Sequence, residues 1–178
     1  MLLNLLVVAH PDDEILGFGA TGAKLVEGGE TVQPIILCGD VDARTNRPSD
    51  TELNQDMLKA NRLLGFSEPI LGSFPNIRMN NVDHIDIVQF IEKQIIDFGP
   101  TRIFTHHPSD LNNDHVQISK ACVAAARLFQ RRGDISRLES LHYMEILSAT
   151  DWAFPANGEG FSPNTYIDVT NYFDIKVS

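Results

Sequence analysis

"LLNLLVVAHPDDE", residues 2–14, places a short apolar run directly before one histidine and three carboxylates. The run at 2–9 carries no charge and is partly β-branched, which is typical of a strand buried on both faces of a parallel sheet. A buried strand seldom leads into so much charge unless the charged groups have a task. This stretch therefore predicts both the fold and a candidate functional site.

Strands and helices are expected to alternate along the rest of the chain. Apolar runs predict further strands at 31–38, 69–74, 101–105, 138–147 and 165–170, and helical periodicity predicts helices at 14–27, 53–64, 82–98 and 116–130. This order favours an α/β fold in a single domain, with a mainly parallel sheet and helices on both faces. Ligands bind such sheets beyond the carboxyl ends of the strands. The polar clusters at 10–14 and 106–115 both fall at that edge.

Composition narrows the classes of partner. The chain has 178 residues and a formal charge of −10, which argues against a nucleic-acid backbone as the main partner. Cys38 and Cys122 lack the spacing of a disulfide framework or a metal site, so we expect two buried thiols in a reducing, cytoplasmic setting. The first apolar run is short and has no basic residues before it. We therefore expect neither a signal peptide nor a membrane span.

The first polar cluster and the start of a later helix predict a metal site. His10 and Asp13 are three residues apart at the expected start of a helix, so an imidazole nitrogen and a carboxylate oxygen can meet one cation. His115 is the expected third ligand, because it also begins a helix after a strand, and Asp114 beside it could orient a neighbour. Two histidines, one carboxylate and an open position are typical of catalytic zinc, although iron or cobalt would be accepted too. Asp12, which is expected to point away from the metal, could then act as a general base in the hydrolysis of an amide or ester.

Other interpretations stay open. Asp12 or Asp13 can cap the helix and interact with its dipole, but a cap needs one residue rather than four. A glycosyltransferase or nucleotide-binding enzyme could use the same two carboxylates to hold Mg²⁺ and a diphosphate, with no role for the histidines. A non-catalytic sugar-binding protein is a third class.

Two motifs resemble those of a known family. AHPDDE at 9–14 and NNDH at 112–115, each after a strand, look like the motifs of the PIG-L/LmbE-like zinc-dependent de-N-acetylases, and three weaker motifs follow in the family's order: LLGF (63–66), FPN (74–76) and YIDVT (166–170). The resemblance covers essentially all of 1–178. It implies a Rossmann-like deacetylase domain that removes acetyl groups from N-acetylglucosamine-type amino sugars or their conjugates.

The family's roles carry over to particular residues. The resemblance implies that His10, Asp13 and His115 hold Zn²⁺ and that Asp12 is the general base. Glu14 is expected to support the site rather than to bind the metal. The small-molecule substrate would be an amino sugar, and a homo-oligomer is compatible with the sequence.

The chain also departs from the family's pattern. Asn112 stands where members often have a histidine that stabilises the oxyanion; an asparagine can still donate a neutral hydrogen bond there, with His106 or His107 as alternatives. The family's substrate-binding arginine is missing from its usual helix, so Arg44 and Arg47 in the preceding loop are the expected replacements, with His107 as a further substrate contact. The chain stops where members commonly continue through another helix.

Overall fold

A computed structural model describes residues 2–39, 49–153 and 160–178. Its sheet contains five parallel strands: β1 Leu3–Val8, β2 Thr31–Ile36, β3 Ile70–Leu71, β4 Arg102–His106 and β5 Ser140–Met144. The helices are α1 Asp13–Glu27, α2 Asp50–Leu63, α3 His84–Phe98, α4 Asn113–Ala125 and α5 Phe173–Val177. Short 3₁₀ turns occupy η1 Met79–Asn81, η2 Leu128–Gln130 and η3 Thr170–Tyr172. The predicted α/β fold class is confirmed.

The strand order β3-β2-β1-β4-β5 puts β1 at the centre of the sheet. Val7 pairs with Ile35 of β2 on one side and with Thr105 of β4 on the other. Successive side chains of a strand point to opposite faces, so Leu5 and Val7 enter one core while Leu6 and Val8 enter the other. This explains why β1 is continuously apolar from Leu5 to Val8 rather than alternating.

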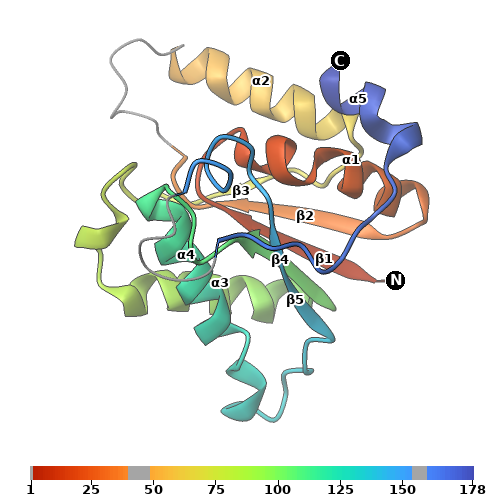
Figure 1. Ribbon diagram of the computed structural model, residues 1–178. Helices are drawn as coiled ribbons and strands as arrows, with labels where there is room; N and C mark the ends of the chain where they lie inside the picture. Colours follow the sequence, from red (N-terminus) through yellow and green to blue (C-terminus); the bar gives the residue numbers. More distant parts are fainter. Residues whose placement is uncertain (1, 40–48, 154–159) are drawn as a thin grey trace.

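Two layers of helices cover the sheet, as Figure 1 shows. One core packs α3 and α4 against the strands, with Ile91 and Ile118 fully buried. The other core packs α1, α2 and α5 on the opposite face, through Phe18, Met57 and Ile175. Among the described residues, every helix is too short or too polar to cross a membrane.

Local signals explain where the helices begin and end. A capping box begins α2: the Ser49 side chain accepts from the Glu52 backbone N–H, and the Glu52 side chain accepts from the Ser49 N–H. Gly99 ends α3 in a left-handed conformation, φ 55°, which glycine adopts without strain. On α1, a Cβ at Gly22 would lie 2.2 Å from the Phe66 ring. Glycine there allows the Phe66 ring to pack directly against the helix.

One predicted strand is wrong. Residues 165–170 form no strand, and among the described strands β5 pairs with β4 alone. Tyr166 is 80% exposed and donates a hydrogen bond to the nearby Pro163 carbonyl. Asp168 accepts from the backbone and side chain of Thr170. Local polar contacts of this kind replace ladder hydrogen bonds, so the apolar alternation there does not reflect a sheet.

Candidate metal centre

Two segments far apart in the sequence meet at one edge of the sheet. His10 lies in the short connection between β1 and α1, and Asp13 is the first residue of α1. His115 lies in the first turn of α4, just after β4. Because β1 and β4 are neighbouring parallel strands, both connections leave the sheet on the same side. The structure thus brings the two polar clusters of the sequence together.

His10, Asp13 and His115 form one buried cluster. Each offers a ligand atom, and these atoms lie within 4.8 Å of one another. Asp13 Oδ2 is 3.3 Å from His10 Nδ1 and 3.2 Å from His115 Nε2. His115 Nε2 is buried and, apart from this ion-pair contact with Asp13, makes no hydrogen bond with any part of the chain that the structure describes. Buried polar atoms normally have a partner, so a buried nitrogen that faces a carboxylate shared with a second imidazole fits a divalent metal such as zinc.

A carboxylate contacts the second ring nitrogen of each histidine in the cluster. Asp114 Oδ2 lies 3.1 Å from His10 Nε2, and Asp110 Oδ2 lies 3.1 Å from His115 Nδ1. Each carboxylate fixes the orientation of its ring and directs the other ring nitrogen toward Asp13. Metal-binding histidines commonly have such a carboxylate on their second nitrogen.

Two other groups of possible ligands overlap this cluster: His10, Cys38 and Asp114, and His106, Asp110 and His115. In the first group, Asp114 already accepts the backbone N–H groups of Ile77 at 2.6 Å and Met79 at 3.1 Å. In the second group, the rings of His106 and His115 stack 3.7 Å apart with 10° between their planes. Lone pairs that lie in parallel ring planes do not converge on one ion, so both groups are poorer sites.

The charges in the cluster also favour a cation. Burial disfavours the charged form of His10, but hydrogen bonds to Asp114 and Asp13 outweigh it and raise the pKa of His10 to about 11. Burial is likewise outweighed at His115, where Asp110 and Asp13 raise the pKa to about 9. The carboxylates therefore attract positive charge, which either protons on the imidazoles or a divalent cation can supply. Metal binding here would release protons.

Asp12 is the N-terminal cap residue of α1, with an exposed side chain. Its backbone φ of 153° lies in a region that L-residues rarely adopt, at a cost of about 1–3 kcal/mol. Glu14 Oε2 accepts from the Asp12 backbone N–H, and Glu14 Oε1 accepts from Asn61 Nδ2, both at 3.0 Å. Glu14 is 1% exposed, and burial raises its pKa to about 7. It holds the backbone of Asp12 and belongs to none of the ligating groups.

The three residues considered for contacts with the oxyanion, Asn112, His106 and His107, take different positions. Asn112 caps α4, because its Oδ1 accepts from the Asp114 backbone N–H at 2.9 Å. That leaves its NH₂ group, which can only donate. His106 is buried behind His115. His107 is half-buried and meets the rings of Tyr143 and Phe161 edge-on; Arg44 and Arg47 lie outside the described residues.

The sequence did not reveal two residues that support the site. Asp110 lies in the polar loop before α4, but it is five residues from His115 and so has no helical spacing to reveal the contact. Asn61 lies on α2 and reaches Glu14 across 47 positions of sequence. The sequence around Asn61 gives no local signal for this contact, because it does not show that the asparagine is buried.

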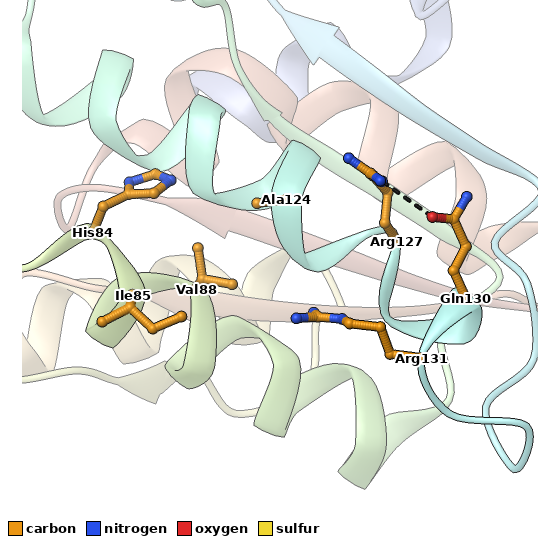
Figure 2. Close-up of a pocket in the computed structure, with 7 residues that line it drawn as sticks. All are labelled: His84, Ile85, Val88, Ala124, Arg127, Gln130 and Arg131. Atoms are coloured by element: carbon orange, nitrogen blue, oxygen red, sulfur yellow. Dashed lines mark hydrogen bonds between the residues drawn. The ribbon is translucent and has the colours of Figure 1, made fainter.

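A separate cavity of about 530 Å³ lies between α3 and the end of α4 (Figure 2). Ile85 and Val88 of α3 face Ala124 of α4, and Arg127 donates to Gln130 at the rim. None of the lining residues belongs to the metal cluster. This cavity therefore has no part in the candidate chemistry.

The comparison with known families agrees with the motifs. The sequence profile of PIG-L, GlcNAc-PI de-N-acetylase, matches residues 5–126, more than half of the chain. The chain therefore belongs to the PIG-L family, as its motifs indicated.

Relatives of this chain include proteins named for deacetylation and one named for another reaction. YaiS of Escherichia coli (strain K12), named an uncharacterized deacetylase, is 27% identical over 127 residues, which is 69% of this chain and 67% of YaiS. The N,N'-diacetylchitobiose deacetylase of Pyrococcus horikoshii has a TM-score of 0.75 at 15% identity, covering 98% of this chain and 67% of that one. GalB, the 4-carboxy-2-hydroxymuconate hydratase of Pseudomonas putida KT2440, has a TM-score of 0.75 at 18% identity, covering 99% and 76%. At these identities the two structures show a shared fold.

Proposed function

We propose that this chain is a zinc-dependent deacetylase that hydrolyses the acetamide of an N-acetylglucosamine-type amino sugar or its conjugate. The observation that carries the proposal is the buried cluster of His10, Asp13 and His115 with Asp12 beside it. Family membership supports the reaction type, and the names of YaiS and of the Pyrococcus horikoshii enzyme support the same class.

Each residue has a distinct role in this proposal. His10 Nδ1, Asp13 Oδ2 and His115 Nε2 would hold the metal. When bound, zinc would acidify a water molecule and polarise the acetyl carbonyl. Asp12 accepts the proton of the attacking water and returns it to the departing amine. The NH₂ group of Asn112, oriented by its cap hydrogen bond, donates to the oxygen that gains negative charge.

The proposed substrate contacts are Arg44, Arg47 and His107. Of these, His107 is the one that the structure describes. It stands against the rings of Tyr143 and Phe161, with ring centroids 5.6 and 5.3 Å away, and aromatic faces of this kind suit the apolar side of a sugar ring. We also propose that residues 1–178 act as one deacetylase domain in the cytoplasm, which the two free, buried cysteines would fit.

An acetate-release assay tests the proposal. The protein is stripped of metal, reloaded with zinc and offered a panel of N-acetylglucosamine conjugates. We expect release only from the loaded protein, and a loss of about 10²–10⁴-fold in rate for Asp12→Asn with zinc still bound. Asp97→Asn, an exposed carboxylate on α3, is the matched control. Full activity of Asp12→Asn, or of the stripped protein, would refute the assignment.

The same assay separates the alternatives. A hydratase shares the fold, so detection of acetate rather than of substrate loss is what identifies hydrolysis. The Mg²⁺ alternative requires oxygen ligands, whereas two of the three ligand atoms here are imidazole nitrogens. Sugar binding without acetate release would indicate the non-catalytic class.

A further inference from the structure

His106 is a fully buried histidine that the proposed reaction does not use. It is the last residue of β4, next to the central strand β1. Its Nε2 accepts a hydrogen bond from the Ala9 backbone N–H at 2.9 Å. Ala9 immediately precedes the ligand His10, so this hydrogen bond ties the end of β4 to the first metal-binding loop.

The hydrogen bond defines the form of the ring. A backbone N–H can only donate, so Nε2 of His106 must present its lone pair, and the ring proton must be on Nδ1. Within the described part of the chain, that Nδ1 has no hydrogen-bond partner. A buried donor without a partner costs stability, so this site carries a histidine where an apolar side chain would avoid that cost.

The face of the same ring supports the second metal-binding loop. The imidazole of His106 stacks on that of His115, with centroids 3.7 Å apart and 10° between the planes. Asp110 fixes His115 only at its Nδ1 edge, which leaves the ring able to tilt about that contact. A flat neighbour against its face removes this freedom and aims Nε2 at Asp13.

His106 is not a ligand in this arrangement. Its Nε2 lone pair is occupied by Ala9, and its plane is parallel to that of His115, so the two rings cannot direct lone pairs at one ion. Its nearest approach to Asp13 Oδ2 is 3.5 Å, longer than the distances from His10 and His115.

We propose that His106 is a positioning residue that sets the geometry of the metal centre from two sides, by accepting the Ala9 N–H before His10 and by stacking on His115. The inference rests on the metal centre of the proposed function, but not on its substrate. Both contacts are needed because each one orients a ligand from a different loop.

Two variants separate the two contacts. His106→Phe keeps a flat ring but has no acceptor for Ala9, and His106→Gln keeps an acceptor near the Nε2 position but has no flat ring. His142→Phe is the matched control, because His142 of the neighbouring strand β5 also stacks on an aromatic ring, Phe104, at 4.8 Å and 16°. All proteins are stripped of metal and checked for folding by circular dichroism.

Zinc affinity of the folded proteins is then measured by competition with a chromophoric chelator. We expect each His106 variant to bind zinc about tenfold or more weakly than the unmodified chain, as is usual when a group that supports a ligand is lost, and His142→Phe to bind as the unmodified chain does. Affinity within twofold of the unmodified chain for both His106 variants overturns the inference, as does an unmodified chain that binds no zinc. Zinc binding with the expected losses but without acetate release sustains the inference and refutes only the proposed function.

Discussion

Replacing Asp114 with asparagine should destabilise the protein and weaken its metal site together. Asp114 is fully buried, and its two oxygens accept from Ile77 and Met79 and face His10 Nε2. An asparagine offers one oxygen, so in its better orientation the new NH₂ group faces the Met79 N–H, and both donors are unpaired. An unpaired buried donor costs about 1–3 kcal/mol, and a charge-assisted hydrogen bond to His10 is lost as well. We expect a loss of about 3 kcal/mol in the free energy of unfolding.

The zinc affinity of the same variant should fall as well. The neutral amide oxygen that then faces His10 is a weaker acceptor than the carboxylate, so it holds the ring less firmly and lowers its basicity, which should weaken zinc binding about 10- to 100-fold. Urea unfolding of the stripped protein measures the first effect, and chelator competition measures the second. Asp97→Asn on α3 removes an exposed carboxylate paired with Lys93 and should change stability by less than about 0.5 kcal/mol. If Asp114→Asn matched this control in both assays, the role assigned to the buried carboxylate would be wrong.

Three further outcomes follow from the structure. Alanine at Gly22 should destabilise by about 1–3 kcal/mol, because the clash with Phe66 exceeds the gain of about 1 kcal/mol in helix propensity. Alanine at Gly19, whose Cβ would approach no side-chain atom closer than 3.3 Å, should be neutral or stabilising in the same urea assay. Burial raises the pKa of Cys122 to about 12, so iodoacetamide at about pH 8.5 should leave it unmodified until the protein unfolds; mass spectrometry that found rapid labelling of native protein would contradict this. Because the pKa of His115 is raised to about 9, zinc must displace protons, and calorimetric affinity should rise with pH between about 6 and 9; a flat profile would show that no proton is released.

Much of the fold follows from local sequence. The apolar run before His10 predicts a central strand because both faces of that strand are buried, and the cap at Ser49 locates the start of α2. The strand expected at 165–170 is absent although its apolar residues alternate, because its polar groups bond locally and it forms no ladder with β5, the edge strand, or with any other strand that the structure describes. Periodicity describes one segment, whereas a sheet also requires a partner.

The candidate ligands were accessible from sequence because each lies in the connection after a strand or in the first turn of the helix that follows it, and the edge of a parallel sheet gathers such positions. The supporting residues were not accessible in this way. Asp110, Asn61 and His106 act through contacts whose partners lie in other elements or at spacings with no local pattern. The structure is needed to see that one side chain meets another across the molecule.

The central place of β1 also bears on how the chain would acquire the proposed metal ion. β1 can pair early with β2, which is separated from it only by α1, but its pairing with β4 must wait until a much longer loop has closed, at greater entropic cost. His10 follows β1 and His115 follows β4, so the two histidines come together only when these strands pair. During refolding, binding of the ion should therefore occur later than the recovery of helical ellipticity. The time at which the ion binds would report when β1 and β4 pair.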